Sequence, residues 1–228
     1  MRRYTLRNCD VEIGAPVEVG RAPGHFWFPT FHLIEGQEIF CEVVRSDDVA
    51  QGKWPATLCL SRDGGMSWTK GRDVDSYGHV SSRIGPRKIL IMPYELGPLT
   101  PGDKRNAVAD GTIVSCSAKG RLAVETTPVK FCGFPRDLND YHVGELRLAT
   151  NGNILSLRDG QLFTTLYGGF VGETKENVFA LTSDDRGLTW RFRSIVAVGA
   201  DIEGATEGAD ESNTVRCARH QQFSLILG

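Results

Sequence analysis

The chain has 228 residues, of which 40% are hydrophobic and 24% charged, and its formal net charge is −2. These values are typical of a soluble globular protein with one large or two small domains. The charges are scattered, so the sequence lacks the basic cluster that favours a nucleic-acid or membrane partner. The longest apolar runs, such as Ile89–Met92, are too short to span a bilayer. No apolar run follows the basic start of the chain, which does not resemble a signal peptide, and we therefore expect a cytoplasmic location.

Short runs rich in Val, Ile, Leu, Phe and Thr follow one another along the chain, and helical periodicity is almost absent. In chain order these predicted strands are PTFHLI, QEIFCEVV, ATLCLS, KILIMPY, TIVSCS, RLAVET, ELRLAT, NILSLR, LFTTLY, NVFALTS and FRSIVAV. Turn sequences separate them at 35–37 (EGQ), 62–65 (RDGG), 150–153 (TNGN) and 158–161 (RDGQ). The pattern predicts an all-β protein and leaves a sandwich, a barrel and a propeller open.

The six cysteines are far apart, and none forms the CxxC spacing of a zinc or redox site. Cys41, Cys59 and Cys116 lie within apolar runs, where a thiol packs like a small hydrophobic group. We therefore expect buried free thiols rather than disulfides. The five histidines show no metal-ligand spacing, and we predict no metal and no cofactor.

One eight-residue pattern occurs twice. Residues 61–68 read SRDGGMSW and residues 183–190 read SDDRGLTW, so both fit Ser-x-Asp-x-Gly-x-Ser/Thr-Trp. Each copy follows an apolar strand. The Ser and Asp side chains can bond the amides of a tight turn, Gly supplies a positive φ, and the Trp ring packs between sheets. The two copies share the positions Ser61, Asp63, Gly65 and Trp68 in the first and Ser183, Asp185, Gly187 and Trp190 in the second.

This pattern resembles the Asp-box of sialidases (neuraminidases) and related BNR-repeat β-propellers, in which it joins the two outer strands of a four-stranded blade. The resemblance covers about residues 23–216 and implies a six-bladed propeller, of which three to four blades are present. The two Asp residues of the box are 122 positions apart, which implies one intervening blade with a decayed box. We expect a single partial propeller domain over 1–228, with blades at about 23–75, 76–137 and 138–202 and the start of a fourth at 203–228.

The resemblance also implies a site for sugar. Sialidases hold the carboxylate of sialic acid with arginines and use an Asp as acid/base and a Tyr activated by a Glu as nucleophile. In this sequence the matching catalytic positions are Asp48, with Asp47 beside it, and Glu211. Arg45 is the matching substrate-binding arginine, and Trp27 stands where the family has the first arginine of its clamp.

Other departures concern the last part of the chain. The five tyrosines all precede Glu211, and after Arg216 the resemblance fades. We expect this tail to result from a frameshift or premature stop in a longer gene. We also expect negligible sialidase activity, because the arginine clamp and the nucleophile are both incomplete. His79 and His142 begin comparable strands of the second and third blades. They could point into the mouth of the central channel or be ordinary polar residues of a strand, and the sequence leaves both alternatives.

Three hypotheses follow. The first is that the chain is a sialidase-like glycoside hydrolase domain that is inactive or incomplete as encoded. The second is a non-catalytic propeller, either carbohydrate-binding, with Trp27 stacking on a sugar, or a scaffold. The third is a gene fragment without independent function. The expected partner is a glycan or small sugar, and open blade edges predict self-association.

Overall fold

The computed structural model describes residues 2–21, 24, 27–47, 54–75, 77–96, 105–142, 148–210, 212–216 and 223–226. In this part of the chain the regular structure is almost entirely β, with two 3₁₀ turns at Leu138–Asp140 and Gly199–Asp201 as the exceptions. No helix in these ranges is long and apolar enough to cross a membrane. The prediction of an all-β protein is confirmed.

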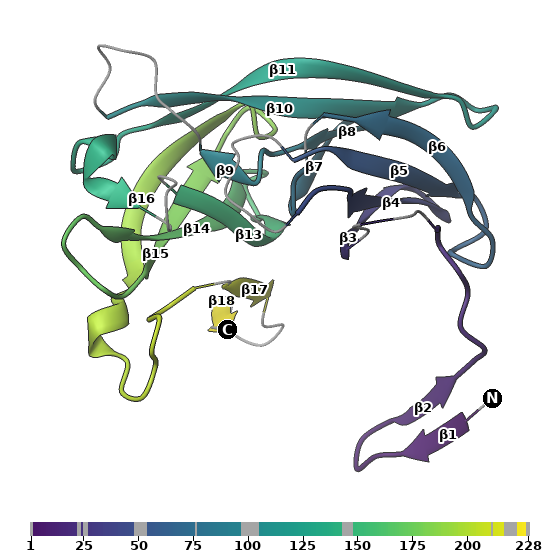
Figure 1. The fold of residues 1–228 in the computed structure, drawn as a ribbon, viewed down its shortest axis with the longest axis horizontal. Helices are drawn as coiled ribbons and strands as arrows, with labels where there is room; N and C mark the ends of the chain where they lie inside the picture. Colours follow the sequence, from purple (N-terminus) through teal and green to yellow (C-terminus); the bar gives the residue numbers. More distant parts are fainter. Residues whose placement is uncertain are drawn as a thin grey trace.

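The strands form three consecutive four-stranded antiparallel units (Figure 1). Unit one contains β3 (Trp27–Glu35), β4 (Glu38–Val44), β5 (Ala56–Ser61) and β6 (Thr69–Val74). Unit two contains β7 (Ser81–Gly85), β8 (Lys88–Ile91), β10 (Ala107–Cys116) and β11 (Leu122–Cys132). Unit three contains β13 (Leu148–Ser156), β14 (Leu162–Phe170), β15 (Asn177–Ser183) and β16 (Thr189–Ala197).

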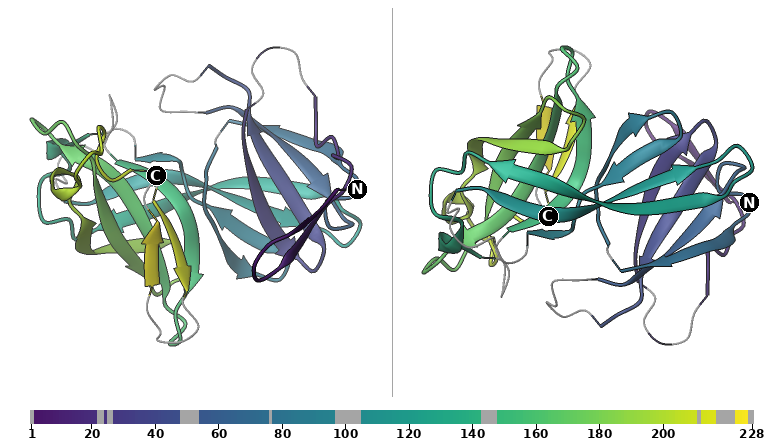
Figure 2. Two further views of the ribbon diagram at one scale, coloured as in Figure 1. Left: turned by 90° about the horizontal axis from the view of Figure 1, so that it is seen from below. Right: turned by 90° about the horizontal axis from the view of Figure 1, so that it is seen from above.

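Units two and three join into one ten-stranded sheet through their outer strands. Lys130–Cys132 of β11 pairs in parallel with Thr189–Arg191 of β16. Two short strands complete this sheet, because β9 (Glu95–Leu96) pairs with β13 and β12 (Tyr141–His142) pairs with β14. In Figure 2 the long β10–β11 hairpin bridges the fan of unit one and the fan of unit three.

The hydrophobic core lies between neighbouring units rather than inside any one of them. Phe40 and Leu58 of unit one pack with Ile89 and Ile91 of unit two. A larger cluster, which includes Leu90, Phe131, Phe179 and the fully buried Trp190, fills the space between units two and three. Each unit therefore depends on its neighbour for burial, as in stacked-sheet architectures.

Two hairpins flank the three units. At one end β17 (Asn213–Arg216) pairs with β18 (Phe223–Ile226), and β17 lies against β13. At the other end β1 (Arg2–Thr5) pairs with β2 (Asp10–Ile13) and extends away from the sheets (Figure 1). The division of the chain into propeller blades and the six-bladed sialidase type stay predictions.

The turns at 35–37, 62–65 and 158–161 are confirmed, but the predicted turn at 150–153 is wrong. Residues 151–154 continue β13, and the pairing with β14 shifts between Asn151 and Leu155. Gly152 has φ +83°, and a Cβ there would lie 2.5 Å from the carbonyl oxygen of Ser212. This glycine therefore permits a bulge and a close approach to the neighbouring backbone, which are the other common uses of Gly in strands.

Candidate functional site

The two repeated octapeptides form turns with the same hydrogen bonds. In the first, Ser61 Oγ donates to Asp63 Oδ1 (2.8 Å) and accepts from the Gly65 amide (2.8 Å), while Asp63 Oδ1 also accepts from the Ser67 amide (2.9 Å). In the second, Ser183 Oγ donates to Asp185 Oδ1 (2.8 Å) and accepts from the Gly187 amide (2.9 Å). The Asp185 carboxylate accepts from the Thr189 amide (2.7 Å). These bonds satisfy amides that the turn would otherwise leave free, so the repeated residues have a structural role.

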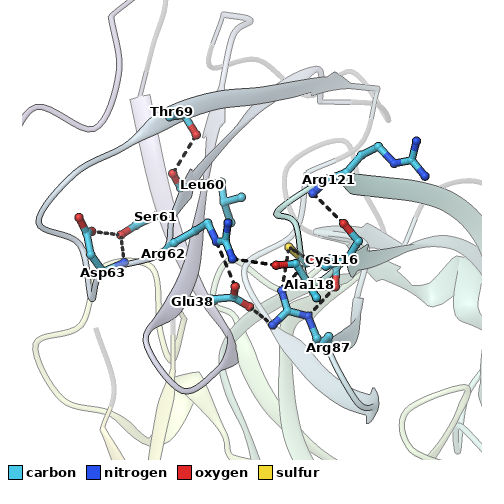
Figure 3. A network of polar contacts seen from close by, with 11 residues as sticks. Glu38, Leu60, Ser61, Arg62, Asp63, Thr69, Arg87, Cys116, Ala118 and Arg121 are labelled. Atoms are coloured by element: carbon cyan, nitrogen blue, oxygen red, sulfur yellow. Dashed lines mark hydrogen bonds and ion pairs between the residues drawn. The ribbon is translucent and has the colours of Figure 1, made fainter.

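The same turns attach one unit to the next. Arg62 donates to the Ala118 carbonyl of unit two (2.8 Å), and Glu38 lies between Arg62 (3.3 Å) and Arg87 (2.5 Å), as Figure 3 shows. In the second turn Ser82 Oγ of unit two donates to the Arg186 carbonyl (2.8 Å). We call this side of the sheets the turn end.

The opposite side, which we call the loop end, carries the sequence-predicted substrate residues that the structure describes. The Trp27 backbone opens β3 and pairs with Val44, the last residue of β4, and Arg45 follows directly. The side chain of Trp27 is not among the described ones. The Arg45 guanidinium lies 3.6 Å from Asp73 on β6, the outer strand of unit one, and Asp47 is exposed. Asp48 and Glu211 lie outside the described residues, so their catalytic roles stay predictions.

A group of aromatic side chains gathers at the loop end, where all three units meet. Trp54 precedes β5, Tyr77 and His79 precede β7, Tyr94 precedes β9, and Tyr167 belongs to β14. Tyr94 is central to this loop-end cluster: its ring centroid is 5.7 Å from Trp54, 6.1 Å from Tyr77 and 4.6 Å from His79, and its hydroxyl is 3.1 Å from that of Tyr167. Such distances are typical of edge-to-face aromatic contacts.

Two buried carboxyl groups support the cluster. Glu95 Oε1 accepts a hydrogen bond from Trp54 Nε1 at 2.7 Å. Glu42 Oε2 accepts from the Gly78 amide at 3.2 Å and so fixes the segment that carries Tyr77 and His79. Burial raises the pKa of Glu42, and His32 and the Gly78 amide oppose that rise only in part. Glu42 therefore keeps its proton to a higher pH than an ordinary glutamic acid does.

His32 links Glu42 to unit two. Its Nε2 lies 3.7 Å from Glu42 Oε2, and its Nδ1 is 2.9 Å from Ser81 Oγ on β7. The nearby His79 is desolvated, which together with the charge on His32 lowers the pKa of His79 to about 4. At neutral pH the His79 imidazole in the loop-end cluster is therefore uncharged, and the Glu42 carboxyl that supports the cluster has a raised pKa.

Phe28 is the exposed member of this region. It is 39% exposed, its ring centroid is 6.5 Å from Trp54, and its carbonyl accepts from the Tyr77 hydroxyl at 2.8 Å. Its φ is +49°, an uncommon value for a bulky residue. This backbone presents an aromatic ring to solvent beside the cluster.

Comparisons with known proteins give no family: no family model and no curated protein match the chain. Its structure is similar to that of a protein of unknown function from Dyadobacter fermentans, with a TM-score of 0.57 and 17% identity over 89% of this chain. The two share a fold. This chain spans only 62% of the length of that protein.

Two more distant structures are similar over most of the chain. An endo-arabinase from Bacteroides thetaiotaomicron has a TM-score of 0.46 and 11% identity over 96% of this chain and 74% of its own. The GH43_1 enzyme from Xanthomonas citri complexed with xylotriose has a TM-score of 0.42 and 8% identity over 78% of this chain and 57% of its own. Both neighbours are glycoside hydrolases with a β-propeller fold, and at these TM-scores they assign no activity to this chain.

The sequence interpretation missed most of the loop-end cluster. Glu42 carried a usable signal, because an acid inside the apolar run IFCEVV is rarely buried without a partner. Trp54 is 41 positions before Glu95, the neighbour of Tyr94 in sequence, and it meets both of them only through the packing of the units. Among the described residues, no group of three or more His, Cys, Asp or Glu is placed to hold a metal ion.

Proposed function

We propose that the chain is a sialidase-like glycoside hydrolase domain of β-propeller type, inactive or incomplete as encoded, that binds sugar at the loop end. The observation that carries this proposal is the gathering of aromatic side chains from three separate units around buried carboxyl groups. The rings of Trp54, Tyr77 and Tyr167 and both carboxyl groups are buried, so the face that can stack on a sugar ring is that of the exposed Phe28 beside them. A fixed cluster between sheets also positions the flanking loops, where propellers collect their binding residues.

The catalytic part of the proposal rests on Asp48 and Glu211, as acid/base and as activator of the nucleophile. Arg45 is only three positions before Asp48 in the sequence. It directly follows Val44, the last residue of β4, whose backbone pairs with that of Trp27. Both acids would act together with loop residues around the cluster, while Glu42 holds the Tyr77–His79 segment in place.

A second candidate is a non-catalytic carbohydrate-binding domain. The position of Arg45 favours it, because its guanidinium pairs with Asp73 on an outer strand instead of serving a carboxylate ligand. Trp27 in place of the first clamp arginine fits the same role. Under this candidate the ligand is a neutral sugar that stacks on an aromatic ring, and Phe28 offers one at 39% exposure.

Turnover and binding assays separate the two candidates. Fluorogenic sialosides and neutral glycosides are incubated with the wild type and with Asp48→Asn and Glu211→Gln. Turnover that both variants abolish supports the hydrolase. A glycan array and calorimetry on the same preparations detect binding without turnover, which supports the second candidate.

Phe28→Ala and Phe31→Ala make a matched pair for the binding assay. Both phenylalanines are on β3 and exposed, at 39% and 56%, but Phe31 faces Trp68 at the turn end of unit one. Affinity should fall in Phe28→Ala and stay unchanged in Phe31→Ala. Equal loss in both variants, or neither turnover nor binding in the wild type, contradicts a sugar site at the loop end.

A further inference from the structure

Two cysteines face each other inside unit one. Cys41 on β4 and Cys59 on β5 are direct partners in the antiparallel register, so both side chains point to the same face of the sheet. Directly opposed residues have Cβ atoms about 4.5–5.5 Å apart. Disulfides span Cα atoms about 4.4–6.8 Å apart and Cβ atoms about 3.5–4.5 Å apart. The backbone therefore needs to close by only about 1 Å to join the two sulfurs.

The other described cysteines lack this arrangement. Cys116 is opposite Leu122, Cys132 is opposite Arg191, and Cys9 is exposed in the turn of the N-terminal hairpin. Cys116 and Cys132 also lie beside arginines, at 3.5 Å from Arg87 and 3.6 Å from Arg191. Within the described ranges, the pair on β4 and β5 is the one place where two thiols share a pairing position.

The pair is enclosed in an apolar layer. Cys41 and Cys59 are 0% and 2% exposed and pack with Val43, under Val19 and Trp68. Burial raises the pKa of Cys41 to about 12, with Cys59 and Glu42 as further causes. The thiols are therefore protonated and unreactive in the closed protein, and an oxidant reaches them only when the Val19 segment or the Trp68 turn opens.

We propose that Cys41 and Cys59 are a redox modification site at which a disulfide-class oxidant, such as oxidised glutathione, converts the two thiols into one disulfide that links β4 to β5. One cysteine loses its proton, and its thiolate attacks the oxidant to form a mixed disulfide and one glutathione thiolate. The second thiolate then attacks the cysteine sulfur of the mixed disulfide and releases the second glutathione. Two electrons pass from the protein to the oxidant, and the two protons end on two glutathione thiols.

The linkage closes the chain segment between the two strands. Residues 42–58 include Arg45 and Trp54, so oxidation would tie the base of the β4–β5 connection at the loop end. The proposed disulfide does not depend on the proposed function. It would restrict the local opening of β4 from β5 at the base of their connection.

The test uses the full chain, reduced and then freed of reductant. It is incubated with oxidised glutathione, both in buffer and at a urea concentration just below the unfolding transition, quenched with acid and alkylated. Non-reducing peptide mass spectrometry should identify a peptide pair joined through Cys41 and Cys59. The thiol count in denaturant should fall by at least one more in the wild type and in Cys116→Ser than in Cys41→Ser or Cys59→Ser, because glutathione on the exposed Cys9 would be common to all four proteins.

A bridging arsenical gives an independent readout of proximity. Phenylarsine oxide binds two adjacent thiols together, so its affinity should fall about 100-fold in either serine variant. Circular dichroism establishes that each variant is folded. The proposal is overturned if the joined peptides are missing under both conditions, or if Cys59 joins another cysteine as readily in the Cys41→Ser variant.

Discussion

Alanine substitution at the two box glycines separates the cost of the turn from the cost of the contact between units. Gly65 and Gly187 both have φ +92°, so the two variants pay the same backbone penalty, about 1–2 kcal/mol. A Cβ on Gly65 meets only Trp68 Cζ2, at 3.6 Å, which is ordinary contact. A Cβ on Gly187 would lie 2.7 Å from Ser82 Oγ.

Ser82 must therefore move in Gly187→Ala and give up its bond to the Arg186 carbonyl. The lost hydrogen bond adds about 1 kcal/mol and the crowding about 1–2 kcal/mol more. We expect Gly187→Ala to be destabilised by about 3–5 kcal/mol in total, against about 1–2 kcal/mol for Gly65→Ala.

Urea unfolding followed by tryptophan fluorescence measures both variants. A Ser82→Ala background removes the hydroxyl, so the penalty of Gly187→Ala should fall close to that of Gly65→Ala. Equal destabilisation of the two glycine variants in the wild-type background would refute the packing of the second turn on unit two. An unchanged penalty in the Ser82→Ala background would do the same.

Three further expectations concern charged groups. Burial raises the pKa of Glu42, so the stability that its protonated form provides is present below about pH 4.5 and is lost as the pH rises through the folded-state pKa; Glu42→Gln should flatten this part of the pH profile in urea titrations. His79 has the opposite sign, because its folded pKa of about 4 lies below its unfolded value: stability falls as the pH drops from 6.5 to 4, and His79→Gln should lose that slope. Glu38→Ala breaks the contacts with Arg62 and Arg87 and should lower the free energy of unfolding by about 1–2 kcal/mol, with a smaller loss at high salt. Glu35→Ala removes an exposed ion pair with Arg83 and should lower it by less than about 0.5 kcal/mol. Thermal unfolding at two salt concentrations measures the last pair, and equal shifts for both would contradict it.

Local sequence signals were enough for most strands and turns. ATLCLS and NVFALTS coincide with β5 and β15, because each is a mostly apolar run that ends at a serine of the repeated octapeptide. The repeated octapeptide predicted both outer hairpins, since its serine and aspartate bond amides only a few residues away. Hydrophobic periodicity by itself missed β6, which only the octapeptide implied, because its side chains are mostly exposed and TKGRDV has no alternation to detect.

Long-range packing explains what was missed. The Asn-Gly at 151–152 predicts a turn when taken alone, but the approach of the Ser212 backbone requires a glycine inside a strand at this point. The loop-end cluster joins Trp54, Tyr94 and Tyr167 across more than one hundred positions of sequence, and no local pattern relates them. The suggested role of Arg45 was argued from its neighbours in sequence, whereas its ion pair with Asp73 depends on the register of β5 and β6.

The parallel pairing of β11 with β16 gives the two copies of the octapeptide unequal tolerance to insertions. An extra residue at 184–188 would shift Thr189–Arg191 against both β15 and β11, and would turn the buried Trp190 out of the core. An extra residue at 62–67 would shift β6, an edge strand most of whose side chains face solvent, together with the contacts of Arg62. Over evolutionary time we expect the first copy to tolerate a change of length better than the second, which two neighbouring strands hold to its present length.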